Sequence, residues 1–410
     1  MEYVRLKDIC DLKNGYAFKS SDYIERSNTL NCRMSNIRPN AKFDIEYNAK
    51  YLPDDYAEEY SEYILNDGDI VIAMTDLAND PKILGVPTIV ETKGYSLLLN
   101  QRVGKLILKN DIKIDKIYLK YALNLPQLKS YYKKFAGGGL QINIGKEQIL
   151  NIKVPIITYK NQQKIVEVLD RAQSLIDKRK AQIEALDELV KSRFIKMCAN
   201  GSSDYENWEK LKIEDMAEQK KGSMRTGPFG SSLLHSEFVD EGIFVLGIDN
   251  AVENHFTWNK MRYITNGKYE RLRNYTVYPG DVIITIMGTV GRSAVIPDDF
   301  PKAINTKHLA CITLNKLIAN PYFISYCIHG HPYVINQLKN ESKGAIMDGL
   351  NLTIIRSIKI PLPPIEVQES FVHFMNQVDK LKFEMEKSLK ELEDNFNSLM
   401  QKAFKGELFN

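Results

Sequence analysis

The chain has 410 residues, of which 44% are hydrophobic and 26% charged, so it is long enough for two to four globular domains. Its net charge of +3 is too small to identify a polyanionic partner, and no apolar run approaches the roughly 20 residues that cross a bilayer. None of the five cysteines forms a CxxC pair, which argues against a zinc site or a disulfide framework. Because the charged N-terminal stretch MEYVRLKDICDLKNGY also lacks an apolar signal core, we expect a cytoplasmic protein.

The first block of the chain, residues 1–157, alternates short apolar runs with turns. DIVIAM (69–74) and GKLIL (104–108) are typical of strands, whereas residues 114–134 have helical spacing. This mixture predicts a compact α+β domain.

The next segment, residues 158–201, predicts one long helix. Its apolar residues recur in steps of four and three, which is the seam of a coiled coil, with Arg179 and Arg193 at seam positions. About 40 residues would form a rod of roughly 60 Å. The apolar seam residues are Ile165, Leu169, Ala172, Ile176, Ile183, Leu186, Val190 and Met197.

The third segment, residues 202–363, repeats the first block. YLPDDYAEEYSEYILNDGDIVIAMTD (51–76) matches YITNGKYERLRNYTVYPGDVIITIMG (263–288) at a constant shift. NQRVGKLILK (100–109) similarly parallels NTKHLACITL (305–314). We therefore expect a second domain with the same framework and a different surface.

The repeat also extends to the domain entrances and to the loops before the helices. Leu6-Lys7 is aligned with Leu211-Lys212 at the two entrances. The loop GGGLQIN (137–143) is aligned with AIMDGLN (345–351).

The last segment, residues 364–410, predicts a second long helix. Its seam contains one irregular step, from Met385 to Leu389, and ends near Gly406. A buried helical hairpin is the simpler alternative to a spacer made of two paired helices. The seam residues are Phe371, Phe374, Val378, Leu381, Met385, Leu389, Leu392, Phe396 and Leu399.

The predicted fold class is therefore α+β. The sequence predicts two similar globular domains held apart by two long coiled-coil helices that pair as a spacer, with an internal repeat. The expected boundaries are 1–157, 158–201, 202–363 and 364–410.

Two catalytic signatures occur in part. FAGGG (135–139) fits a loop that holds S-adenosylmethionine, but the partner motif NPPY is absent, and NPYF (320–323) is better explained by Asn320 capping a helix. Asp69, Glu91 and Lys93 resemble a nuclease metal site, but no such set recurs in the second half. The sequence predicts no catalytic residue and no metal site.

Turn-rich segments that mix cations with Ser, Thr and Asn occur in both domains. Arg and Lys neutralise phosphates, and Arg, Asn, Gln and Ser can also read base edges, so these segments favour nucleic-acid binding. They are KSS (19–21), CRMSNIRPNAK (32–42) and Arg102 in the first domain, and KKGSMRTGPFGSS (220–232), NKMRY (259–263), Arg292 and NTKH (305–308) in the second.

With this organisation the chain resembles the DNA specificity subunits of type I restriction–modification systems. The resemblance covers the whole chain and is strongest in the order variable–helical–variable–helical. Its sequence marks are IKIPLPPIEVQESFV with its first copy IKVPIITYKNQQKIV, YPGDVIITIMGTVGR, PFGSS and KAFKGELF. The first copy departs from the pattern at residues 75–85, where TDLANDPKILG replaces MGTVGR.

The resemblance implies two target-recognition domains held apart by two long antiparallel coiled-coil helices and related by a pseudo-two-fold axis. It implies a non-catalytic subunit that recognises a bipartite, asymmetric double-stranded DNA site, one half per domain. It also implies two methyltransferase subunits and motor-nuclease restriction subunits as partners, with S-adenosylmethionine and ATP bound by those partners and no cofactor bound here. The alternatives are a DNA adenine methyltransferase or nuclease in its own right and a coiled-coil scaffold that binds no DNA. The residues that the resemblance assigns to DNA binding are Lys19, Ser20, Arg33, Arg38, Arg225, Ser231, Ser232, Arg292 and Lys307.

Overall fold

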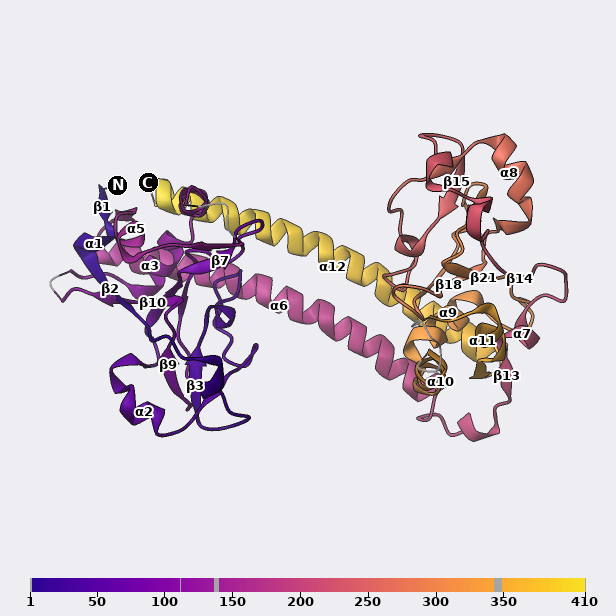
Figure 1. Ribbon diagram of the computed structural model, residues 1–410, viewed down its shortest axis with the longest axis horizontal. Helices are drawn as coiled ribbons and strands as arrows, with labels where there is room; N and C mark the ends of the chain where they lie inside the picture. The colour runs from indigo at the N-terminus through magenta and orange to yellow at the C-terminus, as the bar shows by residue number, and fades with distance from the viewer. Residues whose placement is uncertain (1, 111, 136–139, 343–348, 410) are drawn as a thin grey trace. The chain divides into compact units, whose positions relative to one another are not determined.

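The chain folds into two compact units. The computed structural model describes residues 2–110, 112–135, 140–342 and 349–409. Unit 1 comprises Met1–Arg179 and Ser388–Asn410, and unit 2 comprises Lys180–Lys387. Each unit contains one end of each long helix, α6 (Tyr159–Cys198) and α12 (Ile365–Lys405) (Figure 1).

Unit 1 contains two four-stranded sheets. Their strand orders are β2-β10-β6-β8 and β4-β3-β9-β5, and the second contains the parallel pair β3 and β9. Many strand residues are buried on both faces because helices and the other sheet cover them. The elements are β1 (Glu2–Arg5), α1 (Leu6–Ile9), β2 (Cys10–Asn14), β3 (Thr29–Cys32), β4 (Tyr51–Leu52), α2 (Tyr56–Glu59), β5 (Ile64–Leu65), β6 (Ile70–Ala73), β7 (Thr75–Leu77), β8 (Pro87–Ile89), β9 (Ser96–Leu99), β10 (Val103–Leu108), α3 (Lys116–Leu123), α4 (Pro126–Lys133), β11 (Gln141–Asn143), α5 (Lys146–Leu150) and β12 (Lys153–Ile156).

Unit 2 repeats this framework. Its sheets have the orders β14-β21-β18-β19 and β16-β15-β20-β17, and β13 pairs with β22 as β1 pairs with β12. The α+β class and the internal repeat are thus confirmed. The elements are β13 (Lys210–Lys212), α7 (Ile213–Met216), β14 (Met224–Thr226), β15 (Ile243–Leu246), β16 (Tyr263–Ile264), α8 (Asn266–Leu272), β17 (Thr276–Val277), β18 (Val282–Thr285), β19 (Ser293–Val295), β20 (Ala303–Asn305), β21 (Leu309–Ile312), α9 (Pro321–Gly330), α10 (Pro332–Ser342), α11 (Leu352–Ser357) and β22 (Lys359–Pro361).

The pairing of the first and last strands corrects the alignment of the two domain entrances. Leu211 pairs with Ile360 as Val4 pairs with Val154, so the residue equivalent to Leu6 is Ile213 and not Leu211. Leu6 and Ile213 are both fully buried at the start of a short helix, and this shared burial fixes the register.

The match between 100–109 and 305–314 is also displaced, by one residue. Cys32 pairs with Leu99 in the parallel ladder of unit 1, and Leu246 pairs with Asn305 in that of unit 2. Thr306 is therefore the equivalent of Asn100. Parts of the loops aligned at 137–143 and 345–351 lie outside the described residues.

Two glycines mark the same close approach of the backbone in both units. A Cβ atom on Gly15 would lie 2.3 Å from the carbonyl oxygen of Leu99, and one on Gly227 would lie 2.1 Å from that of Asn305. Only glycine fits where the chain crosses the end of the parallel ladder. The segments that follow these two glycines therefore leave each framework at equivalent places.

Two buried glutamines connect the long helices to the globular cores. The side-chain oxygen of Gln162 accepts a hydrogen bond from Asp115 N at 2.8 Å, and that of Gln368 accepts one from Asn320 N at 2.9 Å. Asp115 and Asn320 cap helices α3 and α9. The explanation of NPYF as a helix cap is therefore confirmed, because the side-chain oxygen of Asn320 accepts from the amides of Tyr322 and Phe323.

The long helices run antiparallel where each unit packs them together. In unit 1 the early α6 residues Ile165 and Leu169 share a core with the late α12 residues Met400 and Phe404. In unit 2 the late α6 residue Phe194 packs on the early α12 residue Phe371, with ring centroids 5.1 Å apart.

Two predicted seam positions in unit 2 are wrong by one residue. Phe194, fully buried, occupies the place expected for Arg193, which instead lies over the Phe374 ring at 5.5 Å. Leu381 is 48% exposed, and its neighbour Lys382 faces α6 and pairs with Asp187 at 2.6 Å. The seam is therefore not a continuous apolar heptad stripe.

Candidate functional site

Three segments of unit 2 meet at one edge of the sheet β14-β21-β18-β19. β14 ends with Thr226 beside Ala310, and β18 ends with Thr285 beside Leu309, so both strands end where β21 begins (Figure 1). We call segments 227–232, 286–292 and 306–308 the loop edge of unit 2. A hydrogen bond of 3.0 Å from Ile286 N to His308 O joins two of them.

The loop edge of unit 2 is structured and polar. The hydroxyl oxygen of Thr285 accepts from Arg292 N at 2.9 Å, and the hydroxyl donates to the carbonyl of Thr289, which holds the turn closed. Gly288 and Gly291 have φ values of 75° and 78°, which suit glycine in such a turn. Ser231, Ser232 and Arg292 are exposed on this edge, and Lys307 is half-buried.

The loop edge of unit 1 lies at the equivalent place. It consists of segments 15–20, 33–36, 74–84 and 100–102, which follow β2, β3 and β6 or precede β10. Lys19 and Ser20 are exposed in the first segment, and Arg33 follows Cys32, whose carbonyl accepts from Asn100 N at 3.1 Å. Arg102 is exposed on this edge too. It was absent from the predicted site residues, although it belongs to a basic segment and precedes a strand.

The third segment of this edge differs most from its counterpart in unit 2. Residues 74–84 occupy the place of 286–290, and they contain β7, which pairs with β11. The buried carboxylate of Asp76 accepts from Leu84 N at 3.0 Å and Ile83 N at 2.5 Å, which folds the longer loop back on itself. The two loop edges therefore present different surfaces on one framework.

Arg38 does not reach the loop edge. Its guanidinium lies 3.6 Å from the centre of the Tyr47 ring, and its amide bonds to the carbonyl of Lys42 at 3.0 Å. Lys42 in turn pairs with Asp177 of α6 at 2.8 Å. The turn that carries Arg38 is therefore held toward the helix.

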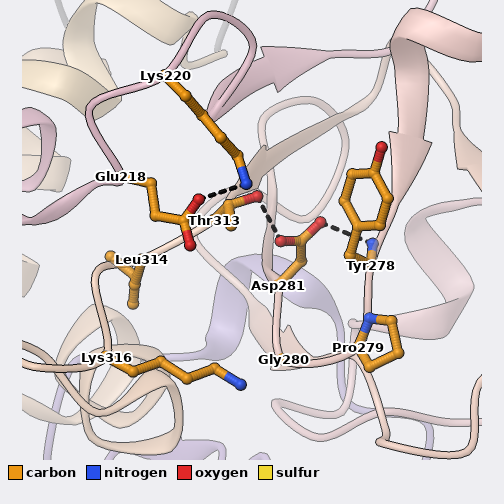
Figure 2. Close-up of a pocket in the computed structure, with 9 residues that line it drawn as sticks. All are labelled: Glu218, Lys220, Tyr278, Pro279, Gly280, Asp281, Thr313, Leu314 and Lys316. Carbon is orange, nitrogen blue, oxygen red and sulfur yellow. Dashed lines mark hydrogen bonds and ion pairs between the residues drawn. The ribbon is translucent and has the colours of Figure 1, made fainter.

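Arg225 is also separated from the other predicted residues, because its side chain is only 8% exposed. It pairs with buried Asp281 and donates to Thr276 O at 2.9 Å, Gly222 O at 3.0 Å and Thr313 Oγ1 at 3.1 Å. Asp281 also accepts from Tyr278 N at 2.8 Å and Thr313 Oγ1 at 2.6 Å (Figure 2). With its donors used inside unit 2, Arg225 supports the fold.

The acidic residues considered for a nuclease make other contacts. Asp69 pairs with Lys105 at 2.5 Å, and Lys93 pairs with Glu46 at 2.8 Å, which raises the pKa of Lys93. Among the described residues, no group of three or more His, Cys, Asp or Glu side chains could hold a metal ion. Residues 136–139 of FAGGG lie outside the described part of the chain.

The buried thiols and imidazoles are held in their neutral forms. Burial raises the pKa values of Cys10, Cys32 and Cys198 to about 12, so their reactive thiolates are rare. Burial also lowers the pKa values of His329 and His331 to about 4. The three thiols and His331 are buried, His329 is half-buried, and none of the five is exposed at either loop edge.

The fold and its two loop edges define a class of protein: a duplicated binding protein with two similar frameworks and two different polar surfaces. The family model described as "Type I restriction modification DNA specificity domain" matches residues 1–185 and 205–394. The chain therefore belongs to the type I restriction–modification DNA specificity family, and it is a non-catalytic specificity subunit. Such subunits are generally cofactor-free.

Individual relatives agree with this assignment. The EcoBI specificity subunit of Escherichia coli is 22% identical and covers 99% of this chain and 85% of its own length. The MjaVIII specificity subunit of Methanocaldococcus jannaschii is 32% identical over 192 residues, which are 46% of this chain and 43% of that protein.

Solved structures share the fold. The type I restriction–modification S subunit from M. genitalium has a TM-score of 0.55 at 14% identity and covers 98% of this chain and 96% of its own. A chain from a structure of type I R-M complex assembly and conformational transition has a TM-score of 0.60 at 16% identity, with 99% and 98% covered. No helix within the described residues is long and apolar enough to span a membrane.

Proposed function

We propose that each loop edge contacts one half of a bipartite, asymmetric double-stranded DNA site. The observation that carries this proposal is the repetition of one sheet edge with different exposed side chains. Cations on such an edge can neutralise phosphates, and Arg, Lys and Ser can hydrogen-bond to base edges. The proposed contacts are Lys19, Ser20, Arg33 and Arg102 in unit 1, and Ser231, Ser232, Arg292 and Lys307 in unit 2.

The chain divides, in this proposal, into two readers and two spacers. Residues 1–157 and 202–363 read the half-sites, and residues 158–201 and 364–410 form the helices that set the distance between them. Arg38 and Arg225 are left out of the contact set because both side chains are engaged elsewhere in their own units.

The subunit directs two methyltransferase subunits and motor-nuclease restriction subunits to the site, which places it in the cytoplasm with the host DNA. S-adenosylmethionine and ATP belong to those partners. The family and the structure of a type I complex among its relatives in fold support this arrangement.

The decisive experiment is to map methylated sites in a host that carries the complete system with the parent chain or with single variants. Arg292→Ala and Lys307→Ala should relax or weaken only the second half of the motif, whereas Lys19→Ala and Arg102→Ala should affect only the first. A lost base contact should cost about 1–3 kcal/mol and relax one position, and a lost phosphate contact should weaken all sites alike.

Lys316→Ala provides the matched control. Lys316 is exposed and follows β21, whereas Lys307 precedes that strand, so the two lysines lie at opposite ends of it. If the loop-edge variants methylate the same motif as efficiently as Lys316→Ala does, these edges do not contact DNA.

A further inference from the structure

The segment that follows the crossing glycine packs its aromatic residues differently in the two units. In unit 1, Tyr16 is 37% and Phe18 8% exposed, and both pack against Tyr60, with ring centroids 4.5 and 5.3 Å away. In unit 2, Phe229 is 54% exposed. Among the described residues, no ring stacking or cation–π contact involves Phe229. The aromatic rings of this segment thus pack on other rings in unit 1, whereas the ring of Phe229 in unit 2 does not.

The backbone around Phe229 holds the ring in a defined place. Gly227 and Pro228 are buried against the framework, and Phe229 begins a single 3₁₀ turn, Gly230–Ser232. The turn is closed by a hydrogen bond of 3.2 Å from Ser232 N to Phe229 O, and Gly230 has a φ of 58° that a side chain would disfavour. Since the turn is anchored by buried Gly227 and Pro228 and closed by this hydrogen bond, presenting an apolar ring to solvent is a feature of the fold.

The surroundings of Phe229 are cationic and polar. The loop edge of unit 2 brings this segment next to residues 306–308, because Gly227 lies against the backbone of Thr306. Lys307 follows directly, and Arg292 and the two serines of the 3₁₀ turn are exposed on the same edge. A second exposed apolar side chain, Met287 at 41%, lies on the segment that bonds to His308.

An exposed aromatic ring surrounded by cations is suited to bind DNA, a polyanion whose stacked bases have apolar faces. We propose that Phe229 is an apolar wedge that enters the base stack of the second half-site while Arg292 and Lys307 hold the flanking phosphates. This inference deepens the proposed function and rests on it. Phe and Met are side chains that DNA-bending proteins insert between base steps, where they partly unstack the bases and kink the duplex.

Unit 1 should read its half-site without such a wedge, because Tyr16 and Phe18 both pack into an aromatic cluster of their own unit. The two halves of the site would then differ in mechanism. The second half would be selected partly by how easily one of its base steps is unstacked, in addition to hydrogen bonds with base edges.

The test uses the purified full chain without methyltransferase, because a methyltransferase could itself extrude a base. The probes are duplexes with the mapped half-sites and 2-aminopurine, whose fluorescence rises on unstacking, at successive positions. With the parent chain, one step of the second half-site should brighten and none of the first. Phe229→Ala should abolish the signal and weaken binding roughly 10- to 100-fold, the range of a lost base–aromatic stack.

Two variants separate the wedge from other roles. Phe229→Trp should keep the signal and most of the affinity. Leu317→Ala removes an apolar side chain that is 87% exposed beyond the other end of β21, and it should change neither. Because Phe229 is half in solvent, thermal unfolding of Phe229→Ala should match that of the parent.

The outcomes are distinct for the two proposals. If the parent binds the second half-site specifically but no step brightens, or Phe229→Ala binds as tightly as the parent, the wedge is refuted and the proposed function stands. The wedge is likewise refuted if Phe229→Ala weakens only the association with a methyltransferase partner, since the ring then contacts protein. If the parent shows no sequence preference at all, the proposed function itself fails.

Discussion

The buried glutamine at the start of α12 should be a main support of unit 2. Gln368 is fully buried, accepts from Asn320 N at 2.9 Å and donates to Pro363 O at 2.9 Å and Ile318 O at 3.1 Å. Gln368→Leu keeps the volume but leaves three main-chain groups without their partner. At about 1–2 kcal/mol for each group left unsatisfied, the free energy of unfolding of unit 2 should fall by about 3–6 kcal/mol.

The equivalent glutamine of unit 1 provides a graded comparison. Gln162 accepts from Asp115 N and donates only to Ile157 O at 2.9 Å, so Gln162→Leu leaves two groups unsatisfied. The same reasoning gives a loss of about 2–4 kcal/mol, confined to unit 1. The exposed neighbours Gln163 and Gln377 allow matched controls on the same two helices, Gln163→Leu and Gln377→Leu, which should change little.

Hydrogen exchange followed by mass spectrometry measures each unit separately. A loss of about 3 kcal/mol should accelerate exchange of core peptides from unit 2 by about 100-fold in Gln368→Leu, since 1.4 kcal/mol is a factor of ten in the opening equilibrium. Core peptides of unit 1 should accelerate less in Gln162→Leu. If Gln368→Leu exchanges like Gln377→Leu, or Gln162→Leu is the more damaged variant, the hydrogen-bond reasoning is wrong.

Gly227→Ala should distort or unfold unit 2, because its Cβ would overlap a backbone carbonyl, and its circular dichroism melt should show a transition lost or lowered. Arg225→Leu should lower the free energy of unfolding by about 3–5 kcal/mol in urea titrations, because Asp281 would be left charged and unpaired in the core, and an unchanged melt would contradict this. The free energy of unfolding should also fall as the pH drops from 6.5 toward 4. Burial lowers the pKa values of His329 and His331 to about 4 in the folded chain, whereas in the unfolded chain both imidazoles bind protons below about pH 6.5. Urea titrations at pH 7.5, 5.5 and 4.5 should show this loss, and His329→Asn should reduce it.

The duplicated framework and the two long helices could be predicted because their signals are local. A Gly-Asp turn before an apolar strand and a repeated apolar spacing are written in consecutive residues, and both recur at a constant shift. The loop edges could be predicted only as basic, turn-rich segments. Their convergence depends on strand order, because β21 (Leu309–Ile312) pairs with both β18 (Val282–Thr285) and the distant β14 (Met224–Thr226).

The incorrect helix-seam predictions concern positions where two neighbouring residues both fit the apolar spacing. Arg193 and Phe194 are both compatible with a four-three spacing, and only the aromatic core around Phe371 selects the phenylalanine. Arg225 stands in a basic segment, so its sequence context resembles that of a DNA contact. The available signal was Asp281, a carboxylate before a buried strand in both repeats, which required a buried cation nearby.

The cation that neutralises this carboxylate comes from different positions in the two units. In unit 1, Lys105 on β10 pairs with Asp69, and its neighbour across the ladder is Lys13. In unit 2, Cys311 occupies the place of Lys105, and the cation has moved one strand outward to Arg225, the equivalent of Lys13.

The longer, forked guanidinium of Arg225 reaches across Cys311, whose thiol lies 3.2 Å from the same Asp281 oxygen. Because Lys105 pairs with Asp69 in unit 1, Lys13 instead donates a hydrogen bond to the carbonyl of Glu62 at 2.6 Å. Both units therefore retain the buried carboxylate and a cation that neutralises it, but the cation comes from β10 in unit 1 and from β14 in unit 2. Because this exchange occurs in the strands, inside each unit, the loop edges can change their exposed side chains independently of it. A chain with two copies of one framework can in this way acquire two different binding surfaces without losing the packing that holds either of them.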